Sequence, residues 1–258
     1  MEIASKRKVG TLKIYINPES NQKLRVIAVD KQKTASVYLD STFEVVARQK
    51  EIEIPFPLSP NKMLIKFESE QKIPLDGIEY VTQIKVIPKQ FSKELYDFID
   101  NVLSFSESAS YSKLGLYADL KLDYADHVRD STKKIIDTPA RTHVQTGKIT
   151  VSKALFKTFT IPQRVFTLLH ERGHYEYREK YDPNSEQAKR EHEKLADDFA
   201  IDMYMSLGFP EEEANNVMAK IIPNESYRDG RDQLIDFHTN TLNKLRNLKK
   251  YRNTWQKP

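Results

Sequence analysis

The spacing of apolar residues changes near residue 90, and this change restricts the possible folds more than any other feature of the sequence. Before it, residues 11–16 and 51–54 alternate between apolar and polar side chains, as half-buried β-strands do. After it, residues 91–99 carry apolar side chains at the three- and four-residue spacing of a helix face. We therefore predict two domains, one over residues 1–90 and one over residues 91–258.

The first domain is predicted to consist of β-strands. Residues 23–29 alternate as well, and three further short strands are expected at residues 36–39, 63–67 and 82–87. Turn-forming pairs such as Asn17-Pro18 bound these segments, and no helical pattern lies between them. Short strands that follow one another at near-regular spacing predict an antiparallel β-sandwich or a barrel-like domain.

The second domain is predicted to be mainly helical, with a small flanking sheet that includes a strand at residues 147–152. Thr160 is a good N-cap, Pro162 suits the first turn, and Gln163 can complete a capping box, so a helix is expected from there to about residue 179. Three further helices are expected, at residues 185–207, 211–221 and 228–250. The predicted fold class is therefore α+β.

Cysteine is absent from all 258 residues. Disulfide bonds, thiolate zinc sites and cysteine nucleophiles are thereby excluded, so any metal ion must be held by His and carboxylate side chains. The N-terminal residues lack the apolar core of a signal peptide, and no segment has the roughly 18 consecutive apolar residues that span a bilayer. We expect a cytoplasmic protein with no membrane partner.

The net charge is only +4, but residues 244–258 hold six basic side chains and no acid. A nearly balanced total gives no general attraction to nucleic acid, so nucleic acid is not the expected partner. The basic segment is expected to be a solvated tail, and the alternative is a tail that binds phosphate groups or a protein partner.

One short motif is typical of a metal site. His170, Glu171 and His174 form an H-E-x-x-H sequence within the helix expected to begin after Thr160. Residues four apart lie on the same face of a helix, so both imidazoles can reach one ion. Zinc accepts neutral imidazole nitrogens, and Glu171 can reach a water on the metal without binding the metal itself.

A third ligand must come from another part of the chain. The metzincin pattern requires Gly at position 177 and His at position 180, where this sequence has Tyr177 and Lys180, so that class is excluded. The next helix offers Glu193 instead. Asp197 lies one turn further along the same face, where it can orient a ligand His.

The combined pattern resembles the gluzincin-type zinc metallopeptidases. H-E-x-G-H is followed about twenty residues later by E-x-x-A-D-x-F-A, so residues 145–208 are similar to the ImmA/IrrE-type peptidases, common in phages and mobile elements, and to the E-x-x-A-D zinc peptidases. The resemblance implies a minimal zincin fold and one zinc ion bound by His170, His174 and Glu193. It also implies hydrolysis of peptide bonds, as an endopeptidase rather than an exopeptidase, with Glu171 as the general base.

Several neighbours of the motif carry expectations of their own. Ala196 and Ala200 lie on the ligand side of the second helix, and their small size lets it approach the first helix near Gly173. His192 lies about 100° from the ligand that follows it and is expected at the surface. Arg172 stands where the similar proteins usually have an apolar residue, so the back of the first helix is expected to be wetter.

Other parts of a peptidase site have candidates elsewhere in the chain. Tyr227, Arg228, Arg231 and His238 lie downstream of the motif, and each could stabilise the oxyanion of a tetrahedral intermediate. The strand at residues 148–152 could align a substrate by edge pairing.

Three functions are compatible with these features. The first is a zinc-dependent metallopeptidase that acts on a protein or peptide substrate, with a strand-rich domain that recruits the substrate or an assembly partner. The second is a non-catalytic component of a phage particle or other assembly that retains a zincin fold, which makes the virion the alternative location. The third is a nucleic-acid-associated protein that binds through residues 244–258, with an affinity that falls steeply with salt.

Overall fold

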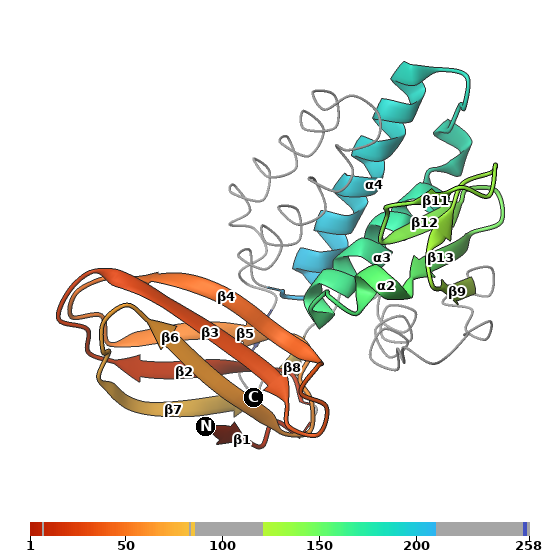
Figure 1. The fold of residues 1–258 in the computed structure, drawn as a ribbon. Helices are drawn as coiled ribbons and strands as arrows, with labels where there is room; N and C mark the ends of the chain where they lie inside the picture. Colours follow the sequence, from red (N-terminus) through yellow and green to blue (C-terminus); the bar gives the residue numbers. More distant parts are fainter. Residues whose placement is uncertain (7, 83, 86–120, 210–254, 257–258) are drawn as a thin grey trace.

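The computed structural model of the chain describes residues 1–6, 8–82, 84–85, 121–209 and 255–256 (Figure 1). Within these residues the protein is α+β, with several mainly antiparallel sheets and three α-helices, which confirms the predicted class. None of the helices in these ranges combines the length and the apolar character needed to cross a bilayer. The predicted domain boundary near residue 90 and the helices predicted at 211–221 and 228–250 lie outside the described residues.

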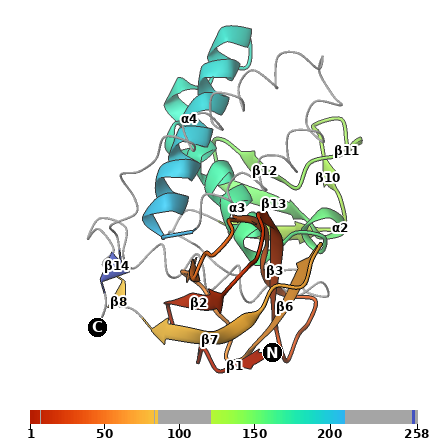
Figure 2. The same ribbon diagram turned by 90° about the vertical axis from the view of Figure 1, so that its left-hand side faces the viewer.

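Two antiparallel sheets form the N-terminal part of the described chain. Their strands are β1 (Glu2–Ile3), β2 (Gly10–Ile16), β3 (Gln22–Asp30), β4 (Val37–Val45), β5 (Glu51–Phe56), β6 (Met63–Ser69) and β7 (Leu75–Thr82). One sheet has the order β1-β6-β3-β4 and the other has the order β5-β2-β7. Figures 1 and 2 show the two sheets as stacked layers.

The alternation of side chains explains why these two sheets pack together. Leu12, Ile14 and Ile16 of β2 are fully buried, and so are Val26 and Ala28 of β3 on the other sheet. All five belong to one apolar cluster that takes side chains from both sheets, so each sheet buries one face against the other. Because side chains alternate along a strand, this buried face sets the register of each pairing.

Most of the predicted strands are confirmed. The strands predicted at residues 11–16, 23–29, 51–54 and 63–67 are all present, and each is one or two residues longer than predicted. β4 extends well beyond the predicted segment 36–39, and the edge strand β7 has no predicted counterpart, because its polar residues and Gly77 mask the alternation. The segment predicted as one strand at 82–87 is divided: β7 ends at Thr82, and β8 (Ile84–Lys85) pairs with β14 (Trp255–Gln256).

A second apolar cluster holds the C-terminal part of the described chain together. This C-terminal part consists of β9 (Lys121–Ala125), β10 (Val128–Arg129), β11 (Ile135–Ile136), β12 (Ala140–His143), β13 (Lys148–Ser152), α2 (Lys153–Phe156), α3 (Ile161–Glu176), the short 3-10 helix η2 (Arg178–Lys180) and α4 (Glu186–Ser206). α3 lies between the small sheet and α4 and contacts both (Figure 1).

β13 lies in the middle of its sheet, which corrects the expectation that residues 148–152 offer an edge to a substrate. β12 pairs antiparallel with one side of β13, and β9 pairs parallel with the other side. Within the described residues β12 is therefore an outer strand, and it lies against α3. The period-two pattern predicts a strand but does not show which neighbours pair with it.

Both long helices begin at their predicted caps. The Thr160 hydroxyl accepts a hydrogen bond from the Gln163 backbone N at 3.3 Å, and the Gln163 side chain accepts one from the Thr160 backbone N at 3.0 Å, so the capping box is present. The Ser185 hydroxyl caps α4 by accepting a hydrogen bond from the Ala188 backbone N at 3.2 Å. α3 ends at Glu176, slightly before the predicted end, and η2 follows it.

The hydroxyl of Tyr80 makes the stability of the strand-rich part depend on pH. It donates to the backbone carbonyl of Lys8 at 2.7 Å, and burial raises the pKa of Tyr80 to about 12. An unfolded tyrosine ionises near pH 10, so the contribution of protonated Tyr80 to stability is complete below about pH 10 and is lost as the pH rises to about 12. We expect Tyr80→Phe to flatten the alkaline fall in the free energy of unfolding, measured by urea unfolding across this interval. An identical fall in both proteins would contradict this expectation.

Candidate metal centre

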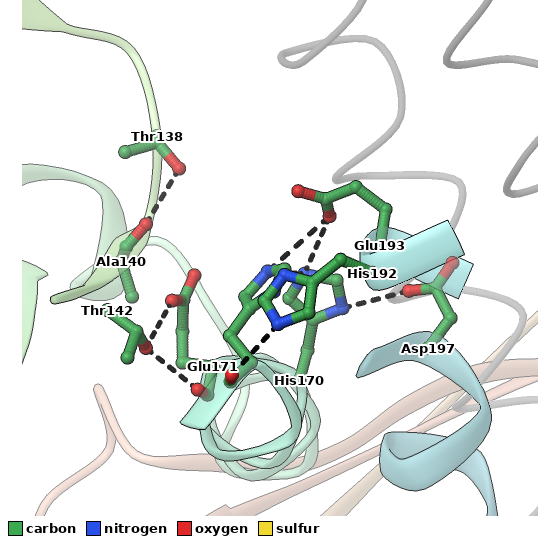
Figure 3. A network of polar contacts seen from close by, with 9 residues as sticks. Thr138, Ala140, Thr142, His170, Glu171, His192, Glu193 and Asp197 are labelled. Atoms are coloured by element: carbon green, nitrogen blue, oxygen red, sulfur yellow. Dashed lines mark hydrogen bonds and ion pairs between the residues drawn. The ribbon is translucent and has the colours of Figure 1, made fainter. Parts of the chain in front are cut away.

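Three ligand atoms from α3 and α4 converge at one point. His170 and His174 lie one turn apart on α3, and their Nε2 atoms are 3.1 Å apart. Glu193 on α4 places its Oε2 3.4 Å from each of these nitrogens (Figure 3). Among the described residues, this is the group of His and acidic side chains close enough together to hold a metal ion. The structure therefore brings together the three ligands predicted from the sequence.

The separations of these atoms match those of a tetrahedral zinc site. Ligands at zinc distances of about 2.0–2.1 Å and at tetrahedral angles lie roughly 3.3 Å from one another. The observed separations are 3.1 Å, 3.4 Å and 3.4 Å. Two imidazoles and one carboxylate also leave one tetrahedral position for water or substrate, as in catalytic zinc sites. The donor set present in the chain therefore fits one zinc ion.

The group is more open on the side of α4 than on the side of α3. The side chains of His170 and His174 have exposed fractions of 11% and 12%, whereas that of Glu193 has an exposed fraction of 36%. The imidazoles are thus fixed inside the protein, and the carboxylate borders the solvent.

The charges of the three ligand groups are coupled. Burial opposes protonation of His170, but its hydrogen bonds with Asp197 and Glu193 outweigh burial and raise the pKa of His170 well above its ordinary value. Burial opposes protonation of His174 as well, and the negative charge of Glu193 outweighs it, so the pKa of His174 is also raised. Burial works to raise the pKa of Glu193, but the neighbouring imidazoles lower that pKa well below its ordinary value. The group therefore attracts positive charge.

Asp197 orients the first imidazole. Its carboxylate is buried, and its Oδ1 lies 2.8 Å from His170 Nδ1. A carboxylate accepts hydrogen bonds, so Nδ1 of His170 carries a proton and its Nε2 is the atom that faces the site. This is the contact predicted for Asp197 from its position one turn after Glu193.

His192 is buried, which corrects the expectation of a surface residue. Its exposed fraction is 1%, its Nδ1 lies 3.2 Å from His174 Nδ1, and its Nε2 donates to the backbone carbonyl of His174 at 3.0 Å. Burial, followed by the charge of His174, lowers the pKa of His192. The turn of about 100° from Glu193 does take His192 off the ligand face. It also takes the ring onto the face of α4 that packs against α3.

Glu171 is held by the small sheet. Oγ1 of Thr142 on β12 lies 2.7 Å from Glu171 Oε2 and 2.8 Å from the Glu171 backbone carbonyl, and both residues are buried (Figure 3). Sequence analysis does not identify Thr142 or β12. The available signal is the turn that ends at Gly147, which has a φ of 67° and joins residues 140–143 to β13 in a hairpin.

Gly173 and Ala196 lie at a close approach of the two helices. A Cβ atom on Gly173 would lie 2.7 Å from the Ala196 Cα and 2.9 Å from its carbonyl oxygen. This confirms the predicted close approach of α4 to α3. Glu193 is one turn before Ala196 on α4, so the same approach brings its carboxylate to the imidazoles.

Arg172 is also buried, which corrects the expectation of a wetter back of α3. Its exposed fraction is 7%, its guanidinium pairs with Glu176 one turn along α3, and it lies 5.2 Å from the centre of the Tyr175 ring. An arginine can be buried when its charge is paired and its flat guanidinium lies against an aromatic ring.

The residues predicted as possible oxyanion donors, Tyr227, Arg228, Arg231 and His238, lie outside the described residues.

Comparisons with protein family models, with curated proteins and with solved structures found no match to this chain. The function is therefore inferred from the sequence motifs and from the geometry of the site itself.

Proposed function

We propose that the chain is a zinc-dependent metallopeptidase of the gluzincin type. The proposal depends mainly on one observation: His170 Nε2, His174 Nε2 and Glu193 Oε2 lie within 3.1–3.4 Å of one another. Three groups with lone pairs repel at such distances unless protons or a metal cation lie among them. Their chemical types and separations suit zinc.

The chain's own residues provide the parts of a hydrolytic mechanism. Bound zinc supplies Lewis acidity, which acidifies a water molecule and polarises the scissile carbonyl. Glu171 then acts as the general base: its carboxylate takes a proton from the attacking water and returns it to the leaving amine. Thr142 Oγ1 at 2.7 Å from Glu171 Oε2 fixes the direction of this carboxylate.

Among the described residues β12 is an outer strand, and it is the proposed place where a peptide substrate aligns. It pairs with β13 on one side, and its Thr142 contacts the proposed base, so a peptide along its other side would pass close to Glu171. An extended peptide can add to a sheet edge through main-chain hydrogen bonds, which bind it without demanding a particular sequence. This arrangement favours an internal segment of a polypeptide, and hence endopeptidase activity.

The remaining parts of the chain are assigned as follows. Residues 91–258 form a minimal zincin domain, with β12, β13 and β9 as its flanking sheet. Residues 1–90 form a sandwich-like accessory domain, whose two sheets share one apolar cluster. This domain recruits the substrate or a partner in an assembly, and the enzyme acts in the cytoplasm.

The zinc content of the purified protein tests the proposal. We expect about one zinc ion per chain in the wild type, measured by plasma mass spectrometry after dialysis. In His170→Ala and in Glu193→Ala the content should fall below roughly a tenth of this value, because two remaining ligands do not retain the ion. His143→Ala is the matched control, since His143 is exposed on β12 and lies outside the ligand group.

Two outcomes would contradict the proposal. The first is a folded wild-type protein that takes up no zinc from a zinc-buffered solution. The second is an equal zinc content in the wild type and both ligand variants, which would place the ion elsewhere in the chain.

A further inference from the structure

We infer that His192 is a positioning residue that fixes the tautomer of the zinc ligand His174. This inference rests on the proposed zinc site and adds to it a residue outside the ligand motif. The exposed fraction of His192 is 1%, because its ring lies between α3 and α4. Both ring nitrogens contact His174.

The backbone of α3 decides the proton arrangement of His192. A carbonyl oxygen only accepts hydrogen bonds, so the contact of 3.0 Å between His192 Nε2 and the His174 carbonyl requires the proton on Nε2. Burial favours the neutral imidazole. Its Nδ1 then carries a lone pair and acts as an acceptor.

That acceptor in turn decides the proton arrangement of His174. The two Nδ1 atoms are 3.2 Å apart, and one proton must lie between them. Because His192 Nδ1 is the acceptor, the proton belongs to His174 Nδ1. In the neutral ring of His174, Nε2 is then unprotonated, and it lies 3.4 Å from Glu193 Oε2.

His192 and Asp197 thus have the same role: each accepts a hydrogen bond from Nδ1 of one ligand imidazole. Asp197 accepts from His170 Nδ1 at 2.8 Å, and His192 accepts from His174 Nδ1 at 3.2 Å. In both imidazoles Nε2 is therefore the atom that can bind the metal. The site is therefore preorganised by α4, which carries Glu193 and both orienting side chains.

Ring packing holds His192 in this orientation. Its ring centre lies 4.8 Å from that of His174 and 5.1 Å from that of Tyr181, which follows η2. A phenylalanine at position 192 retains this packing but removes both ring nitrogens. An asparagine loses the packing but places its Oδ1 at the same bond separation from Cβ as the imidazole Nδ1, so it can still accept from His174.

The zinc affinities of these two variants test the inference, measured by competition with a chromophoric chelator. We expect His192→Phe to bind zinc about 10- to 100-fold more weakly than the wild type, the usual effect of losing a partner of a ligand. His192→Asn should stay within a few-fold of the wild type. His127→Phe is the matched control, because His127 is exposed and is not a member of the ligand group.

Nitrogen NMR of the imidazoles provides a second readout that packing alone would not change. In metal-free protein at alkaline pH, His174 should carry its proton on Nδ1 in the wild type and in His192→Asn. In His192→Phe the proton should move toward Nε2. Thermal unfolding of each variant checks that the fold is retained.

Failure of the inference is distinguishable from failure of the proposed function. If the wild type binds zinc and His192→Phe binds it equally well with an unchanged His174 tautomer, His192 is a packing residue and the inference is wrong. If the wild type binds no zinc, the proposed function is wrong, and the NMR tautomer of metal-free His174 alone decides whether His192 positions it.

Discussion

Glu171→Gln is expected to lower the rate of peptide cleavage by about 10²- to 10⁴-fold while leaving the zinc content unchanged. Glutamine has the shape of glutamate but cannot take a proton from water at neutral pH. Its side chain can still form a hydrogen bond with Thr142 Oγ1, which lies 2.7 Å from Glu171 Oε2 in the wild type, so the fold should be retained. Glu171 is the neighbour of a ligand and is absent from the ligand group itself.

The rate is best measured on a broad peptide library, with cleavage products followed by mass spectrometry. Glu179→Gln is the matched control, because Glu179 is exposed on η2 just after α3. Cleavage by Glu171→Gln at the wild-type rate would remove Glu171 from the mechanism. A wild-type protein that binds zinc but leaves the whole library uncut would favour the alternative function, a zincin fold that serves as a scaffold in an assembly.

Gly173→Ala is expected to destabilise the protein and to weaken zinc binding together. The new Cβ would lie 2.7 Å from the Ala196 Cα and 2.9 Å from its carbonyl oxygen, and both obstacles are backbone atoms that cannot rotate away. Overpacking of this kind costs about 1–3 kcal/mol, whereas replacing glycine by alanine in a helix gains about 1 kcal/mol. The clash should win, with a net loss of up to about 2 kcal/mol in the free energy of unfolding.

The same clash should move α4 away from α3. Glu193 is one turn before Ala196, so its carboxylate would leave the imidazoles, and we expect zinc to bind about tenfold more weakly or worse. Urea unfolding of the metal-free protein measures the first effect, and chelator competition measures the second. Gly77→Ala is the control: its Cβ would meet only a side-chain carbon of Tyr15 at 3.7 Å, an ordinary contact. Wild-type stability and zinc affinity in Gly173→Ala would contradict the close approach of the helices.

The two long helices and the ligand set are the parts of the site that local sequence features predict well. A helix start is encoded within four residues by Thr160 and Gln163, and the capping box they form is present. The spacing of His170 and His174 places both imidazoles on one helix face whatever surrounds them. The positions of Glu193 and Asp197 follow from the same geometry once α4 packs against α3.

The two residues whose burial is predicted wrongly, His192 and Arg172, have a common explanation. His192 and Arg172 are polar residues in charged surroundings, and the sequence pattern favours solvent for both, yet their exposed fractions are 1% and 7%. Helical periodicity gives the angle between two side chains on one helix. It does not give the neighbour that each angle faces.

By itself, the sequence determined the chemical character of the candidate site: no thiolates, two imidazoles one turn apart, and a carboxylate on the following helix. These are local properties of residue type and helical spacing. Only the tertiary structure decided that β12 is an outer strand among the described residues, that Thr142 holds Glu171, and that His192 contacts His174. Each of these depends on which surfaces of distant segments meet. That choice is made by the burial of the apolar cluster and by close contacts such as the one between Gly173 and Ala196.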